Sequence, residues 1–140
     1  ADNSQSVPFL GEADKLRNLS ASLAGNSQIQ KNFNVNSLYF GEKVSLEDSL
    51  NFHAEQTDIY AALSETEDLF TNKRSAIVLL SDGNQSLGRD FRYFKMGSGK
   101  EILPVIIGDT ARYRDLSIGR INVNRYAFLN NKFPVEVFVN

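Results

Sequence analysis

The sequence of 140 residues contains no cysteine and only one histidine, His53. Without cysteine the chain forms neither disulfides nor thiolate metal sites, and one histidine cannot build a histidine-rich zinc centre. No apolar run approaches the roughly 18–20 residues that a membrane helix needs. Lys+Arg total 15 against 17 for Asp+Glu, the formal net charge is −2, and no basic block is present. We therefore expect no membrane segment in this chain and no nucleic acid as its partner.

What the sequence does contain is typical of a folded domain. Hydrophobic residues make up 41% and charged residues 23% of the chain, which are ordinary proportions for a globular protein. A chain of this length buries roughly two thirds of its unfolded surface on folding, so it needs no metal or disulfide for stability.

The strongest strand signals are two apolar runs that each end beside an aspartate. Ser75–Leu80 leads into Ser81-Asp82-Gly83, and Ile102–Ile107 leads into Gly108-Asp109. Continuous apolar runs of this kind are typical of strands buried on both faces of a parallel sheet. In open α/β sheets, ligands bind outside the C-terminal ends of the strands. The two aspartates are therefore expected at a functional edge, although Asp109 is also a plausible turn residue.

Helical periodicity is clearest over residues 58–70, where apolar side chains recur three and four positions apart. A second helix is predicted over residues 10–24 and a short one over 89–94. Alternation rich in Val, Phe and Tyr predicts a strand within 32–44 that ends near Gly41. This order of helices and strands favours an α/β fold with a mostly parallel sheet and right-handed crossovers.

Beyond about residue 116 the pattern changes to alternating strand sequence with no helical periodicity. Two apolar stretches lie on either side of an Asn130-Asn131 turn signal. We interpret residues 1–116 as one α/β domain, and residues 117–140 as a β extension that is either a linker or the opening strands of a following β-sandwich-like module.

Small oxygen-bearing side chains occur in three separate loops. Asp2, Ser4 and Ser6 alternate at the start of the chain, Thr57 precedes the helix over 58–70, and Asp82 follows the first buried strand. Hard divalent cations such as Mg²⁺ prefer oxygen ligands of this kind. The two carboxylates would balance the charge of the cation, and the three hydroxyls would complete its shell. A coordination position left open would then accept a carboxylate from another molecule.

Each of these residues also has an ordinary structural interpretation. The first three would belong to a polar N-terminal segment, Thr57 would cap a helix through its hydroxyl, and Asp82 would shape a turn through its carboxylate.

Taken together, three segments resemble the metal-ion-dependent adhesion site of the von Willebrand factor A domain. They are Asp2-Asn3-Ser4-Gln5-Ser6, Thr57 followed by Asp58-Ile59-Tyr60-Ala61-Ala62-Leu63, and Leu79-Leu80-Ser81-Asp82-Gly83. The resemblance covers residues 1 to about 116 and implies a Rossmann-like, doubly wound fold. It also implies a Mg²⁺ or Mn²⁺ site with Asp2, Ser4, Ser6, Thr57 and Asp82 as ligands, some of them through water.

The chain departs from this family at its first strand. In the family a hydrophobic strand at the centre of the sheet precedes the first loop, whereas only Ala1 precedes Asp2 here. An unpaired central slot is rarely tolerated. We therefore expect Ile121–Phe128 or Val135–Val139 to supply the pairing, within the chain or by strand exchange in a homodimer.

The resemblance implies divalent-metal-assisted protein–protein recognition, with no enzymatic activity and with a partner protein that supplies an acidic side chain. It further implies a larger parent protein at an extracytoplasmic location, periplasmic or cell-surface, tethered to a membrane through segments outside this chain. Two alternatives stay open. One is a metal-assisted phosphoryl hydrolase that uses Asp2 or Asp82, and the other is a structural spacer with a degenerate metal site.

Overall fold

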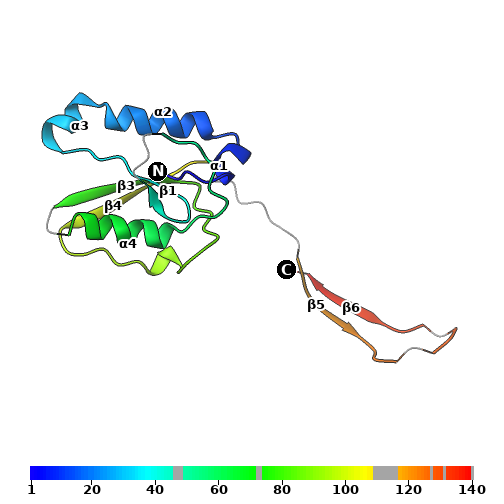
Figure 1. Ribbon diagram of the computed structural model, residues 1–140. Helices are drawn as coiled ribbons and strands as arrows, with labels where there is room; N and C mark the ends of the chain where they lie inside the picture. Colours follow the sequence, from blue (N-terminus) through cyan, green and yellow to red (C-terminus); the bar gives the residue numbers. More distant parts are fainter. Residues whose placement is uncertain (46–48, 72–73, 109–116, 127, 131, 140) are drawn as a thin grey trace. The chain divides into compact units, whose positions relative to one another are not determined.

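The computed structural model describes residues 1–45, 49–71, 74–108, 117–126, 128–130 and 132–139. The chain divides into two compact units, Ala1–Asp109 and Thr110–Asn140, which are described separately. Helices and strands occur together and the sheets are small, so the fold is broadly α/β (Figure 1). Within the described residues, no helix has the length and apolar character needed to cross a membrane.

The first unit is built around one pair of parallel strands. Its elements are α1 (Ser6–Phe9), α2 (Ala13–Ala24), α3 (Ser27–Asn32), β1 (Tyr39–Phe40), β2 (Val44–Ser45), α4 (Ile59–Leu69), β3 (Ser75–Ser81), the 3₁₀ helix η1 (Phe91–Tyr93) and β4 (Lys100–Ile106). Strands β3 and β4 are parallel, with Ser75 opposite Lys100 and Ser81 opposite Ile106. Strands β1 and β2 form a short antiparallel pair.

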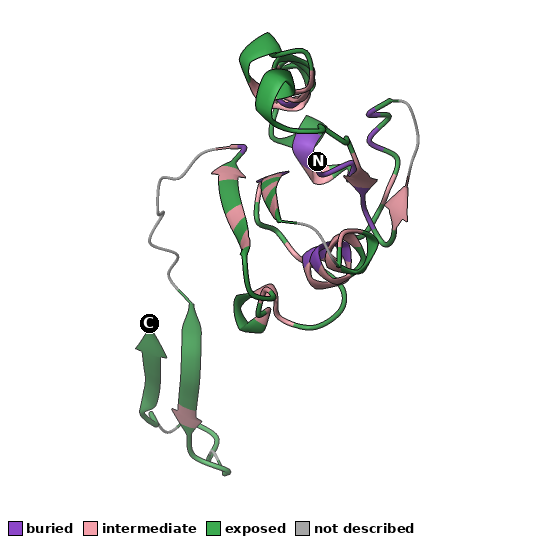
Figure 2. Cartoon of the chain, turned by 90° about the vertical axis from the view of Figure 1, so that its left-hand side faces the viewer, coloured by how far each residue is buried: buried purple, intermediate pink, exposed green. Residues whose placement is uncertain are grey.

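Helices cover both faces of the β3–β4 pair, with α2 on one side and α4 on the other (Figure 1). Because side chains alternate along a strand, Leu80 belongs to the same core cluster as Leu16 of α2, whereas Leu79 packs against the cluster that contains Ile59 of α4. The buried residues that Figure 2 colours purple lie in this unit. The two apolar clusters hold the end of β3 between two helices, which makes it a firm base for a site.

The predicted strands over 75–80 and 102–107 are confirmed as β3 and β4, and the helix over 58–70 is confirmed as α4. The expectation that both strands are buried on both faces is wrong, because β3 is buried only at its last two residues and β4 has no fully buried residue. Pro104 lies within β4, opposite Leu79 of β3. Among the described strands, β4 pairs with β3 alone. It is thus an edge strand of its sheet, and an edge strand tolerates the missing N–H of a proline.

Other predictions are wrong in part. The strand expected over residues 32–44 is only Tyr39–Phe40, and a short helix, α3, precedes it. The side chain of Asn26 caps α3 by accepting hydrogen bonds from the amides of Gln28 and Ile29 at 2.9 and 3.2 Å. The helix expected from residue 10 begins at Ala13, and the short helix over 89–94 is a single 3₁₀ turn.

The first residues of the chain lie between β1 and β3. The Asp2 amide donates a hydrogen bond of 2.8 Å to the Leu80 carbonyl, on the β3 side. On the other side, the Phe40 amide donates to the Ala1 carbonyl at 3.0 Å, and the Asn3 amide donates to the Phe40 carbonyl at 2.7 Å. These bonds bring the Asp2–Ser6 loop to the C-terminal end of β3.

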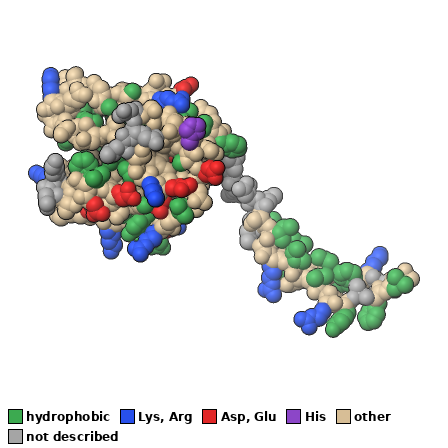
Figure 3. All heavy atoms as spheres, viewed as in Figure 1, with side chains coloured by type: hydrophobic (Ala, Val, Ile, Leu, Met, Phe, Trp, Pro, Cys, Tyr) green, Lys and Arg blue, Asp and Glu red, His purple; other side chains and the backbone are tan. Residues whose placement is uncertain are grey.

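The second unit is a two-stranded antiparallel hairpin of β5 (Ile118–Val123) and β6 (Val135–Val139). Its apolar side chains are mostly exposed, and Figure 3 shows hydrophobic atoms along its length. The two strands pair with each other. That Ile121–Phe128 or Val135–Val139 extends the first sheet, within the chain or by exchange with a second chain, stays a prediction.

The structure describes only one residue of the predicted Asn130-Asn131 turn. Asn130 lies in a turn with a φ of 62°, a left-handed conformation that asparagine tolerates better than most residues. Asn131 lies outside the described residues, and so does Asp109, the aspartate after Gly108 at the end of the β4 run.

Candidate functional site

Asp2 is fully buried at the start of the first loop. Its Oδ1 atom accepts a hydrogen bond of 3.0 Å from the Ser4 amide, and its Oδ2 atom accepts one of 2.7 Å from the Ser81 hydroxyl. The first loop therefore holds one carboxylate oxygen, and the end of β3 holds the other. The Asp2 carboxylate is thus fixed at the end of β3.

The two serines of the first loop lie together. The hydroxyls of Ser4 and Ser6 share a hydrogen bond of 2.8 Å, and Ser4 is buried while Ser6 is partly exposed. Ser6 begins α1, so its position is set by the first turn of a helix. The alternation of Asp2, Ser4 and Ser6 thus brings their side-chain oxygens together in one loop.

Asn3, between these residues, anchors the loop to the segment before α4. Its Oδ1 atom accepts a hydrogen bond of 2.6 Å from the Phe52 amide, and its Nδ2 atom donates one of 3.0 Å to Asn51. Phe52 is buried and has a φ of 56°. That left-handed conformation is unfavourable for a bulky residue, so the Asn3 side chain and the surrounding core must hold it in place.

Asp82 directly follows β3, and its two oxygens differ. Oδ1 accepts a hydrogen bond of 2.9 Å from the Asn84 amide, as in the turn-shaping role that the sequence also allows. Oδ2 is buried and has no hydrogen-bond partner among the described residues. A buried, unpartnered carboxylate oxygen is costly, and a cation is a natural partner for it.

Thr57 is buried but does not cap α4. The cap is Asp58, whose Oδ1 atom accepts a hydrogen bond of 2.8 Å from the Ala61 amide. The Thr57 backbone instead bonds to the loop after β3. Its amide donates to the Ser86 hydroxyl at 2.9 Å, and its carbonyl accepts from the amides of Ser86 and Leu87 at 3.0 and 3.1 Å. The interpretation of Thr57 as a capping residue is therefore wrong.

The two carboxylates of the site repel each other. Burial raises the pKa of the Asp2 carboxyl above its ordinary value, and the negative charge of Asp82 adds to this rise. Hydrogen bonds from Ser4 and Ser81 act in the opposite direction. Two carboxylates close enough to interact in a desolvated place favour either a proton or a cation between them.

The structure thus joins the segments of the five predicted ligands. Asp2, Ser4 and Ser6 form one loop, Asp2 is bonded to Ser81 next to Asp82, and Thr57 is bonded to the loop that begins at Asp82. Within the described chain, no hydrogen bond links the side chain of Thr57 or Asp82 directly to the other three. Sequence reasoning missed Ser81 as a contact of Asp2, although it lies in the quoted Leu79–Gly83 segment.

The donor set fits a hard divalent cation. Two carboxylates and three hydroxyls are all oxygen ligands, and Asp82 Oδ2 is a buried acceptor without a partner. In the described part of the chain, no three His, Cys, Asp or Glu side chains gather as a metal site. A site with only two acidic ligands, completed by hydroxyls, does not require such a group.

Comparison with known proteins returns no match, whether with models of protein families, with curated proteins or with solved structures. Function is therefore inferred from the side chains of the site and their surroundings.

Proposed function

We propose that this chain is a divalent-metal-assisted protein-recognition module of the von Willebrand factor A type. The main support is the Asp82 carboxylate, which directly follows the two buried residues at the end of β3 and has one oxygen that is buried and unpartnered. It lies in the same loop region to which the Asp2 and Thr57 segments are hydrogen-bonded. Convergence of these three segments is what the resemblance requires.

The proposed ligands divide into two kinds. Asp2 and Asp82 carry the negative charge, which formally balances a Mg²⁺ or Mn²⁺ ion. Ser4, Ser6 and Thr57 add neutral oxygens, so the set does not become more negative than the cation is positive. When bound, the ion would supply an electrophilic coordination position for a carboxylate. The partner is accordingly a protein with an exposed Asp or Glu side chain.

The finer features of the fold and setting belong to the same proposal. We infer a doubly wound, mostly parallel sheet of which β3 and β4 are part, in a larger protein that operates outside the cytoplasm and is tethered to a membrane through other segments. Strand exchange between two copies of the chain is one way to extend the sheet beyond β3 and β4. These inferences rest on the resemblance of the three motifs.

Calorimetric titration of the 140-residue chain with Mg²⁺ and Mn²⁺ tests the proposal. We expect one binding site, weakened at least about tenfold by Asp82→Asn. Asp68→Asn is the matched control, because Asp68 is an exposed aspartate on α4 and its substitution should leave binding unchanged. Absence of binding, or equal effects of the two substitutions, would contradict the proposal and favour a structural spacer with a degenerate metal site. Mg²⁺-dependent hydrolysis of a phosphate ester that Asp82→Ala abolishes would instead favour the hydrolase.

A further inference from the structure

The short helix α1 carries an exposed apolar segment immediately after the first loop of the candidate site. Pro8, Phe9 and Leu10 are consecutive and all exposed, Phe9 at 91% and Leu10 at 49%. Among the described residues of the first unit, Phe9 is the most exposed of the large apolar side chains. A run of three exposed apolar residues is unfavourable in water unless it serves a contact. The segment is therefore a candidate contact surface.

The core fixes α1 at the C-terminal ends of the two parallel strands. Val7 is fully buried and belongs to the same core cluster as Leu80, near the end of β3, and Ile107, directly after β4. Leu10 lies over the end of β4, since a Cβ atom at Gly108 would be 3.5 Å from its Cδ1 atom. The exposed segment thus lies at the same edge of the sheet as the candidate metal site.

Phe9 and Leu10 share a helix face with Ser6, one of the proposed metal ligands. The Phe9 amide donates to the Gln5 carbonyl at 3.2 Å, and the Leu10 amide donates to the Ser6 carbonyl at 3.0 Å, so this turn is helical. Residues three and four positions apart on a helix are neighbours, with Cβ atoms about 5–6 Å apart. A molecule bound to a cation at Ser6 would therefore have Phe9 and Leu10 within reach.

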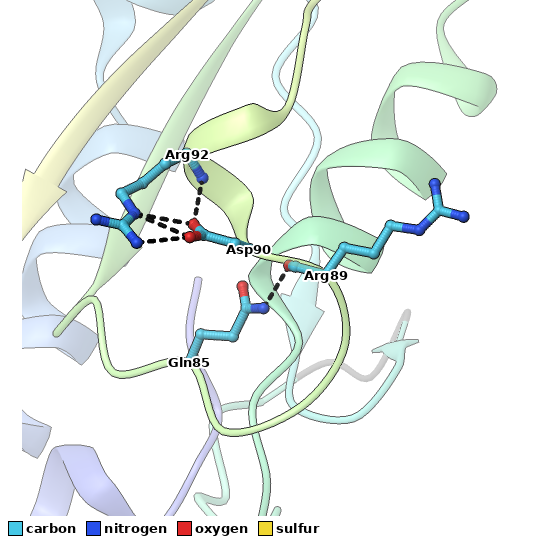
Figure 4. Close-up of polar contacts among 4 residues, drawn as sticks. All are labelled: Gln85, Arg89, Asp90 and Arg92. Atoms are coloured by element: carbon cyan, nitrogen blue, oxygen red, sulfur yellow. Dashed lines mark hydrogen bonds and ion pairs between the residues drawn. The ribbon is translucent and has the colours of Figure 1, made fainter.

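The loop after β3 also borders the site, since it begins at Asp82, but its polar side chains are bonded to one another. The Gln85 Nε2 atom donates a hydrogen bond to the Arg89 carbonyl (Figure 4). Arg92 binds the Asp90 carboxylate, with its Nη2 atom 2.6 Å from Oδ2 and its Nε atom 3.0 Å from both oxygens (Figure 4). The charges of Arg92 and Asp90 thus balance each other within the loop, and the apolar surface beside the site is that of α1.

We propose that Phe9 and Leu10 bind a large apolar side chain of the partner, next to the acidic side chain that reaches the metal. This inference rests on the proposed function and specifies the partner further. In an extended segment, side chains two positions apart point to the same side and are about 6–7 Å apart. This spacing is close to the 5–6 Å expected between Ser6 and Phe9 on the helix. The recognised element is accordingly an Asp or Glu with a large apolar residue, such as leucine, two positions away.

Two peptides of equal length test this assignment. Acetyl-Leu-Gly-Asp-Gly-Leu-amide places a leucine two positions from the aspartate in both chain directions, whereas acetyl-Gly-Gly-Asp-Gly-Gly-amide has no leucine. We expect the 140-residue chain at saturating Mg²⁺ to bind the leucine peptide about three- to tenfold more tightly, because part of a leucine side chain leaves water. Amide chemical shifts in NMR titrations measure both affinities, and EDTA should abolish the binding of both peptides.

Substitution assigns the preference to α1. Phe9→Ala removes most of the exposed apolar surface and should bring the two affinities within about twofold. Phe33→Ala is the matched control, since Phe33 is also an exposed phenylalanine and directly follows α3, at the other end of α2 from α1 (Figure 1). With its 12 residues, α2 is about 18 Å long. This control should therefore keep the preference of the unmodified protein.

The possible failures are distinguishable. Equal Mg²⁺-dependent binding of the two peptides by the unmodified protein overturns the role of Phe9 and Leu10 and leaves the metal site standing. A preference that survives Phe9→Ala, or that Phe33→Ala also removes, overturns this role as well. A dimer of the chain that Phe9→Ala dissociates would assign the exposed segment to a second copy and contradict the proposal. If neither peptide binds in the presence of Mg²⁺, the proposed recognition function and the role of α1 are both wrong.

Discussion

The Ser81 hydroxyl donates a hydrogen bond of 2.7 Å to Asp2 Oδ2, across 79 positions of the sequence. The same hydroxyl oxygen accepts a hydrogen bond of 3.0 Å from the Gly83 amide. Ser81 therefore connects the first loop of the chain with the turn that follows β3. Both partners of the Asp2–Ser81 bond are buried, so the bond is shielded from water and sets the relative position of the two loops.

Replacing Ser81 with alanine should destabilise the protein by about 1–3 kcal/mol, because a buried carboxylate oxygen of Asp2 loses its donor. Urea unfolding of the two proteins measures the difference. Ser37→Ala serves as the control, since Ser37 is exposed, and its effect should stay within about 0.5 kcal/mol. Equal effects of the two substitutions would mean that the Asp2–Ser81 bond does not contribute to stability.

Asp2 should make the metal-free protein more stable in mild acid than at neutral pH. Burial raises the pKa of this carboxyl in the folded state above its unfolded value, so the folded state binds the proton more tightly. The stability that Asp2 contributes is then complete below the unfolded pKa and is lost as the pH rises through the folded pKa.

The measurement is the free energy of unfolding of the wild type minus that of Asp2→Asn, in EDTA, between pH 7 and pH 4. Groups that do not interact with Asp2 cancel in this difference, which reports Asp2 together with its coupling to the Ala1 amino group, whose pKa burial lowers to about 6 and the charge of Asp2 raises. As the pH falls, the free energy of unfolding of the wild type should rise relative to that of Asp2→Asn. A difference that stays constant, or that favours the wild type at high pH, is incompatible with a buried carboxylate whose pKa is raised.

Gly88 packs directly against the Asp58 carboxylate that caps α4. Its φ is 82°, and a Cβ atom there would overlap that carboxylate. Gly99 has a similar φ of 79°, but no atom lies within 4 Å of the position of its Cβ. Gly99→Ala should cost about 1–2 kcal/mol from backbone strain alone. Gly88→Ala should cost about 1 kcal/mol more, because Asp58 must also move away from the Ala61 amide.

Thermal or urea unfolding of the two alanine variants compares these costs. The pair shares the backbone strain, so only the contact with Asp58 separates them. If both variants lose the same stability, the close approach of Gly88 to Asp58 has no part in holding the loop after β3 against α4.

Local patterns were sufficient to predict the elements that have strong periodicity. The apolar runs of β3 and β4 and the apolar stripe of α4 each specify an element without reference to distant residues. The alternating sequence over residues 32–44 did not specify an element in this way, because the strand that forms there, β1, is only two residues long. Its strand partners come from Val44–Ser45 and from the start of the chain. Tertiary pairing there overrides the propensity of the residues.

The candidate site could likewise be predicted only in part. Asp2, Ser4, Ser6, Thr57 and Asp82 were recognised as candidates from residue type and order. Their surroundings could not be predicted, since the partners of Asn3 and Asp2 lie 49 and 79 positions away. The unpartnered oxygens of Asp82 and Gln85 are likewise properties of the folded loop, which no pattern of residue types reveals.

Paramagnetic broadening by Mn²⁺ tests most directly whether the three loops surround one cation, because the effect falls steeply with distance from the ion. At substoichiometric Mn²⁺, the amide NMR signals of Asn3–Ser6, Thr57–Asp58 and Asp82–Gln85 should broaden together and recover when EDTA is added. Broadening confined to exposed acidic residues such as Glu65 and Asp68, or the absence of selective broadening, would contradict a shared metal site.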